Sequence, residues 1–252
     1  MRPREIALLA RALGDIAYTP PAAWSSGLQA AAARRLPTFS PPELVDLAAG
    51  LCRMRVDVER GFGSALLEAT ADALPGMRSA DVASLAATVA SGVGGALAPS
   101  DAWVGALRAR SLEVLPQMGP RELMELLPAV VKIRQAQQRR KSADADLGGE
   151  TSPPAGESHK TEPLLDPDWC GALLESCRFK LTRFTAQSLP QLIECIAQAG
   201  AAPDTTWLSA FSDVSQSKAD VLSGPDVART LVTLVLRLGY VPRSSMLRAQ
   251  VG

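Results

Sequence analysis

The sequence predicts an all-α fold, namely an α-solenoid of repeated antiparallel helix pairs with about 38 residues per repeat. Three observations predict it. An acidic residue recurs at Glu5, Glu43 and Asp81, 38 residues apart each time. An apolar stripe of helical spacing follows each of these residues, and the alternation typical of strands is absent. A repeat of roughly 20–50 residues is typical of stacked arrays, so the period determines the fold class.

The first helix of each unit, called helix A, begins near the acidic residue, which is taken as position zero. Positions +1, +4, +5 and +8 are apolar or small, as at Leu44, Leu47, Ala48 and Leu51. This spacing gives one apolar face of an amphipathic helix. In chain order, the zero position holds Glu5, Glu43, Asp81, Glu122, Ser188 and Asp226.

The recurring carboxylate has two interpretations, acid–base chemistry and helix capping. Ser40, Thr185 and Ser223 lie three residues before a zero position, and Pro41 follows Ser40. This is the spacing of a capping box, in which the residue at the helix start and the one three later exchange hydrogen bonds. Because a capping residue accompanies the zero position, capping is the better interpretation.

The second helix, called helix B, begins near an aromatic residue: Trp24, Phe62, Trp103, Trp169 or Trp207. A small residue follows it after three and after eight positions, a large apolar residue after four, and an apolar anchor after fifteen. Small residues at helical spacing let neighbouring helices approach closely. The constant partners predict that the tryptophans belong to the core, because stacking on bases would require exposed rings.

The unit boundaries predict helical repeats over residues 1–134, an insertion over 135–163, and repeats of the same solenoid over 164–252 with a truncated last unit. The insertion is polar and rich in Ser, Gly and Pro, so we expect a disordered loop, dispensable for folding over 136–162. A shorter insertion covers residues 91–95. The first residues resemble helix A more than a transit peptide. Neither end carries a polar capping repeat, which favours a longer protein or a partner that covers the ends.

The composition argues against several classes of protein. The formal net charge is zero, and the apolar runs are interrupted too often for a membrane span. The only histidine, His159, lies in the insertion, and no nucleophile–base pair or phosphate-binding glycine loop is recognisable, so we expect neither an enzyme nor a cofactor. The cysteines lack metal-ligand spacing and are predicted to be buried free thiols. They are Cys52, Cys170, Cys177 and Cys195.

The units resemble the octotricopeptide repeat. The matching features are the S-P-x-E-L-x-x-L start at residues 40–47, the proline-rich approach to Trp24, and the closing L-P-x-M at 74–77 and 115–118. Degenerate approaches precede Trp169 and Trp207, and the resemblance covers the chain apart from the insertion. The units ending at Phe184 and Leu222 depart from L-P-x-M, so packing without base reading is an alternative for these degenerate units.

The resemblance implies a function. Octotricopeptide-repeat proteins are encoded in the nucleus, are typical of green-algal organelles, and bind organellar RNA to support its maturation, stability, splicing or translation. Some hold ribosomal RNA within algal mitochondrial ribosomes. The resemblance therefore implies an RNA-binding protein that stabilises RNA, in the mitochondrion rather than the chloroplast. The alternatives are a chloroplast RNA maturation or translation factor and a scaffold that binds protein in a large organellar complex, ribosomal or other.

Positions +3 and +7 of helix A are the candidates for contact with bases. Position +3 changes its hydrogen-bonding character in every unit while the framework stays constant, as in helical repeats that read one base per unit. Free variation at a solvent-exposed position gives the same pattern, so both explanations remain open. The candidates are Asp46, Gly50, Ser84, Thr88, Glu125, Gln191, Cys195, Arg229 and Thr233.

Basic residues near the ends of both helices are the candidates for contact with phosphates, which require positive charge. The net charge of zero counts against this, because RNA-binding domains are usually basic. The candidates in helix A are Arg53, Lys132 and Arg237. Those in helix B are Arg108, Arg110, Arg178, Lys180 and Arg183.

Overall fold

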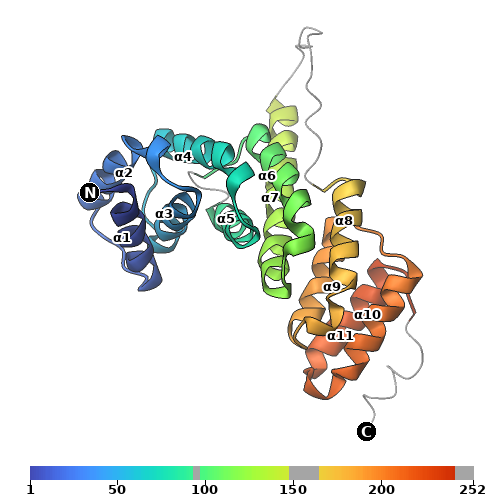
Figure 1. The fold of residues 1–252 in the computed structure, drawn as a ribbon. Helices are drawn as coiled ribbons and strands as arrows, with labels where there is room; N and C mark the ends of the chain where they lie inside the picture. The colour runs from blue at the N-terminus through green and yellow to red at the C-terminus, as the bar shows by residue number, and fades with distance from the viewer. Residues whose placement is uncertain (93–96, 148–164, 242–252) are drawn as a thin grey trace.

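The computed structural model describes residues 1–92, 97–147 and 165–241, and these residues form an all-helical repeat fold without a strand (Figure 1). This confirms the predicted all-α class. Successive helix pairs follow one another along the molecule, so the first and last pairs lie at opposite ends. None of the described helices is both long and apolar enough to cross a membrane.

The helices A form one row in which each packs on the next. They are α1 (Pro3–Asp15), α3 (Pro41–Met54), α5 (Ser79–Gly92), α7 (Pro120–Leu147), α9 (Ser188–Ala199) and α11 (Gly224–Val232). A π-helical turn, η6 (Thr233–Arg237), continues α11 and also packs on α9. The prediction that each helix A lies beside the next is confirmed.

The helices B form a second row, again with each helix packed on the next. They are α2 (Ala22–Ala33), α4 (Arg60–Ala73), α6 (Asp101–Val114), α8 (Pro167–Arg178) and α10 (Thr205–Ser217). A short 3-10 helix follows each of them: η1 (Leu36–Thr38), η2 (Leu74–Gly76), η3 (Leu115–Gln117), η4 (Leu181–Arg183) and η5 (Ala219–Val221).

The closing L-P-x-M motif forms this 3-10 turn. The amide N–H of Met77 donates to the carbonyl oxygen of Leu74 at 3.0 Å, and the corresponding bond forms at the other four turns. Phe184 and Leu222 make it although their units lack the proline. The degenerate units therefore keep the geometry of the complete ones.

The predicted apolar stripe is buried in the four inner helices A, with Leu47 and Leu126 fully inaccessible to solvent, and is partly exposed at Leu9, Leu13 and Leu231 in α1 and α11. Trp103, Trp169 and Trp207 are also buried, which confirms their assignment to the core. Trp24 is the exception, with 37% of its surface exposed. No helix pair of the described chain packs on its side of α2, so its ring is left uncovered.

Hydrogen bonds at the starts of the helices A confirm the capping interpretation. The Ser40 amide donates to the Glu43 carboxylate at 2.8 Å, and the Gly119 amide does the same to Glu122 at 2.6 Å. Thr185 was predicted as the cap of α9, but α9 begins at Ser188 with Gln187 before it. The Thr185 hydroxyl instead donates to the Ser188 hydroxyl at 3.1 Å.

The expected start of the insertion was wrong. Residues 135–147 continue α7, because this stretch is rich in Ala, Gln, Arg and Lys, which favour helix. Gln137 donates to the Asp101 carboxylate at 2.9 Å and Arg140 to the Pro99 carbonyl at 3.2 Å, so the extension is held against the start of α6. Residues 148–162 of the predicted loop, and 93–95 of the shorter insertion, lie outside the described residues.

Candidate nucleic-acid interface

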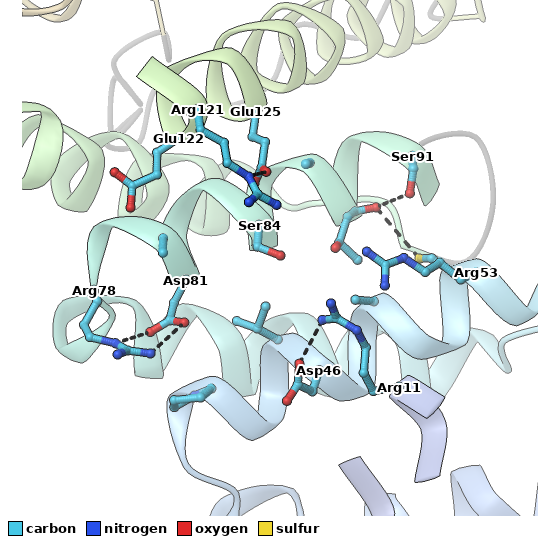
Figure 2. A pocket seen from close by; sticks show the side chains of 17 residues that line it. Arg11, Asp46, Arg53, Arg78, Asp81, Ser84, Ser91, Arg121, Glu122 and Glu125 are labelled. Carbon is cyan, nitrogen blue, oxygen red and sulfur yellow. Dashed lines mark hydrogen bonds and ion pairs between the residues drawn. The ribbon is translucent and has the colours of Figure 1, made fainter. Parts of the chain in front are cut away.

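A groove of about 810 Å³ runs across three consecutive helices A, α3, α5 and α7, and α1 contributes Arg11 to it (Figure 2). Each of the three helices places its +3 residue in the groove: Asp46, Ser84 and Glu125 respectively. All three side chains are partly exposed. The structure thus brings together three of the residues predicted to face bases, one from each successive unit.

Arginines and carboxylates line the groove in equal number. The arginines are Arg11, Arg53, Arg78 and Arg121, and the carboxylates are Asp46, Asp81, Glu122 and Glu125. Figure 2 shows Arg11 directed at Asp46, Arg78 at Asp81 and Arg121 at Glu125. Their closest N–O distances are 3.0, 3.0 and 3.4 Å. The groove therefore carries no net charge, although positive charge is placed along all of it.

These ion pairs are weak. The side chain of Arg121 is 93% exposed and that of Arg78 is 77% exposed. Exposed pairs of this kind contribute about 0–1 kcal/mol and are screened by salt. At one end of the groove, the Asp15 carboxylate pairs with both Arg53 and Arg11, the latter at 3.1 Å. Asp15 thereby holds two guanidinium groups close together.

The +7 candidates are buried, which corrects their assignment to an exposed face. A Cβ added to Gly50 would lie 2.3 Å from the carbonyl carbon of Ala10, so Gly50 is needed for the close approach of α3 to α1. Cys195 is buried, and this burial raises the pKa of its thiol to about 11. Thr233 is buried too, and its hydroxyl donates to the Arg229 carbonyl at 2.9 Å. Thr88 lines the groove but is only 8% exposed.

The +7 residues are buried because each inner helix A has another helix A on both sides. Its buried surface is therefore wider than the single stripe read from the sequence, and +7 falls within it. Gln191 and Arg229 at +3 are exposed, but they do not line this groove. Lys132 and Arg237 are also exposed and outside the groove, whereas Arg53 lines the groove.

Three of the basic candidates of helix B hold neighbouring units together. The Arg110 guanidinium donates to the Met77 carbonyl at 2.6 Å, and Lys180 donates to the carbonyls of Leu115 and Pro116 at 3.3 and 3.0 Å. Both therefore cap the 3-10 turn of the preceding unit, and desolvation lowers the pKa of Lys180. Arg108 pairs with Asp166.

These contacts correct the assignment of Arg108, Arg110 and Lys180 to phosphates, while Arg178 and Arg183 are exposed. Lys218, which was not predicted to have this role, donates to the Thr182 carbonyl at 2.9 Å. Its signal was present, because Lys180 and Lys218 both lie eleven residues after the aromatic residue of their unit.

A second set of hydrogen bonds fixes the row of helices B. The indole N–H of Trp103 donates to the Thr70 hydroxyl at 3.0 Å, and that of Trp169 donates to the Ser111 hydroxyl at 2.8 Å. Thr70 and Ser111 occupy the eighth position after the aromatic residue of the preceding unit. The hydroxyl at this position therefore has a role in addition to the small size that was predicted for it.

Donor and acceptor vary together at three of the four contacts between helix B units, and Trp207 is the exception. Phe62, which has no N–H, follows a unit with Ala32 at the eighth position. Trp207 follows a unit with Cys177 there, and its indole donates instead to the Leu174 carbonyl at 2.9 Å. This pairing was a signal in the sequence for a hydrogen bond between units.

The described residues hold no group of His, Cys, Asp and Glu suited to a metal ion. The four cysteines are free, and all but Cys52 are buried. A scan against protein-family models finds no match, and a search of curated proteins finds no similar sequence. Any functional interpretation therefore depends on the residues and geometry described above.

Proposed function

We propose that this chain binds single-stranded RNA along the groove over α3, α5 and α7, and acts as an RNA-holding helical-repeat protein rather than an enzyme. One observation carries the proposal: three consecutive units each place a different polar +3 side chain in one groove lined by arginines. The resemblance to octotricopeptide repeats adds the organellar setting, with mitochondrial ribosomal RNA as the first candidate and a chloroplast transcript as the second.

The arginines would bind the phosphates. Each now pairs with a carboxylate, but these exposed pairs contribute little, so exchanging a carboxylate for a phosphate costs little. A guanidinium group can donate two parallel hydrogen bonds to a phosphate, which favours arginine for this role. Arg11 and Arg53, already held together by Asp15, would form the strongest phosphate contact at their end of the groove.

The +3 side chains would contact the bases. A carboxylate accepts hydrogen bonds only, so Asp46 and Glu125 favour bases that present an amino or imino N–H. The Ser84 hydroxyl can donate or accept and discriminates less. One base per helical unit is the arrangement known for repeat proteins that read RNA. We therefore expect a strong preference opposite α3 and α7 and a weak one opposite α5.

The test compares two sets of substitutions. Arg11, Arg53 and Arg121 are changed together to Gln, and a control changes the exposed Arg178 and Arg183 of the other helix row to Gln. Binding of labelled single-stranded RNA is measured by fluorescence anisotropy over a range of salt concentrations. The groove variant should bind more weakly to all sequences, and its salt slope should fall by about 0.7 per phosphate contact removed.

The control should bind like the wild type. Thermal melting of both variants verifies that folding is unchanged. If the groove variant kept the affinity and salt slope of the wild type, RNA binding in this groove would be refuted. Changing Glu125 to Gln tests base reading separately, because it should alter the preference at one base and leave the salt slope unchanged.

A protein-binding scaffold is the second candidate. Equal numbers of arginines and carboxylates line the groove, which suits a polypeptide of mixed charge better than a polyanion. Ultraviolet crosslinking in cells followed by sequencing of attached RNA separates the two functions. Recovery of one RNA region supports the first candidate, whereas chemical crosslinks from groove residues to one protein, without RNA, support the second.

A further inference from the structure

The C-terminal half of α7 is a basic extension of the row of helices A. α7 has 28 residues, whereas α3 and α5 have 14 each. Between Leu126 and Ala143 it carries five cations and no carboxylate, although the net charge of the whole chain is zero. The cations are Lys132, Arg134, Arg139, Arg140 and Lys141. Residues 132–141 therefore concentrate positive charge, and they are called the basic extension.

The fold itself uses two of these cations. The guanidinium groups of Arg134 and Arg140 each donate to a backbone carbonyl, at 2.7 and 3.2 Å. Lys132, Arg139 and Lys141 are exposed, and their side chains make no hydrogen bond or ion pair with other described residues. The sequence has no carboxylate three or four residues from Lys132 or Arg139, the spacing that forms ion pairs on a helix. These two charges thus lack the carboxylate partners that the groove arginines have.

Lys132 and Arg139 continue the face of α7 that lines the groove. Glu125, Lys132 and Arg139 are seven residues apart. Seven residues make almost two turns of an α-helix, so successive side chains project within about 20° of each other and lie about 10 Å farther along the axis. Because Glu125 lines the groove, this stripe leads from the groove onto the basic extension. Lys141, two residues after Arg139, projects from the opposite side of the helix.

We propose that an RNA strand bound in the groove continues along this face of α7, where Lys132 and Arg139 hold its phosphates. The inference rests on the proposed function and adds a second contact segment outside the groove. A polyanion fits these side chains, because cations that neutralise phosphates release the counterions condensed on RNA. No carboxylate has to be displaced first, unlike at Arg78 or Arg121 in the groove. Each contact is therefore expected to add its full share of salt-dependent affinity.

The test measures how affinity grows with the length of the RNA. Oligouridines of about 4 to 16 nucleotides, the range of site sizes known for one OB fold, are titrated with the whole chain at several salt concentrations. Affinity for the wild type should rise once the RNA is long enough to reach from the groove to Arg139. The double variant Lys132→Gln/Arg139→Gln should lack this rise and bind the shortest RNA like the wild type. With the longest RNA, its salt slope should be smaller by about 1.4, or about 0.7 for each phosphate contact.

Arg139→Gln and Lys141→Gln form a matched pair, because each removes one exposed cation from the same helix. Arg139→Gln should lower the salt slope by about 0.7, whereas Lys141→Gln should bind every RNA like the wild type. Glutamine favours helix nearly as well as lysine and arginine, so circular dichroism should show an unchanged helix content in all variants. Equal losses in the two single variants would overturn the proposal, because positive charge on any face of α7 would then be sufficient.

The remaining outcomes separate this inference from the proposed function. A double variant with the length dependence and salt slope of the wild type would overturn the basic extension and leave the groove intact. If the variant lacking Arg11, Arg53 and Arg121 kept its affinity for the shortest RNA, the groove would fail, and a loss of affinity for long RNA in the double variant would support RNA binding at the extension alone. Oligoglutamate of equal charge probes the other class of partner. If it bound the basic extension as tightly as RNA, an acidic protein segment would fit better and the proposal would be overturned.

Discussion

Replacing Thr70 by Val tests whether the hydrogen bonds between helix B units stabilise the fold. Valine has almost the shape of threonine, so the substitution leaves no cavity. It removes the hydroxyl that accepts the Trp103 indole N–H at 3.0 Å, and both side chains are 1% exposed. Water cannot reach the abandoned donor, so the indole N–H remains buried and unsatisfied.

The expected cost follows from this burial. A buried donor that loses its partner costs about 1–3 kcal/mol of stability, more than the net contribution of an ordinary hydrogen bond. Thr70 also donates to the Leu67 carbonyl at 2.8 Å, and this bond is lost as well. We therefore expect Thr70→Val to lower the free energy of unfolding by about 2 kcal/mol.

The assay is urea unfolding followed by circular dichroism, for the wild type, Thr70→Val, Trp103→Phe and the double variant. Phenylalanine has no N–H, so in that background the valine leaves no donor unsatisfied and should cost at least about 1 kcal/mol less. Ser64→Ala, which removes an exposed hydroxyl from the same helix, is the control and should change stability by less than about 0.5 kcal/mol. Equal costs of Thr70→Val in both backgrounds would refute the reasoning.

Three further predictions concern stability and use the same unfolding assay. Trp103→Ala should cost about 3–5 kcal/mol because its ring is buried. Trp24→Ala should cost less, because 37% of its surface is already exposed, and equal costs would contradict the assigned positions. Gly50→Ala should destabilise by about 1–3 kcal/mol or more, because the added Cβ meets the backbone of α1. Gly105→Ala, with open space around its Cβ, should instead stabilise by about 0.5–1 kcal/mol. Burial raises the pKa of the Cys177 thiol from 9.0 to about 12. Between these pH values the thiol stays protonated in the folded state and is deprotonated in the unfolded state. Stability should therefore be intact below pH 9 and fall between pH 9 and about 12, more steeply in the wild type than in Cys177→Ala.

Local regularities in the sequence were sufficient to predict the helix pairs. The apolar stripe around Leu47 depends only on the pitch of one helix, and the cap at Ser40 depends only on residues three apart. Both were correct for that reason. The end of α7 was missed because the composition of residues 135–147 was interpreted as loop, whereas tertiary hydrogen bonds from Gln137 and Arg140 hold it as helix.

The site was predicted only in part, because it depends on neighbouring units. Position +3 was correctly expected to be accessible, and the groove contains Asp46, Ser84 and Glu125. Position +7 failed because a flanking helix A covers it, which no pattern within one helix can reveal. Lys180 was taken for a phosphate ligand because its partners are backbone carbonyls of another unit, and because its spacing of eleven residues from the aromatic residue, shared with Lys218, was overlooked.

The polar residues of a unit are divided between two tasks. The indole bonds and the lysines and arginines that cap the 3-10 turns fix how one helix B sits on the next, away from the groove. The +3 side chains contribute little to packing, since they are partly or fully exposed. Substitution at +3 can therefore change what the groove recognises at little cost in stability. The bonds between units restrict the residues at the eighth position and leave +3 free, which allows one fold to present a different surface in each unit.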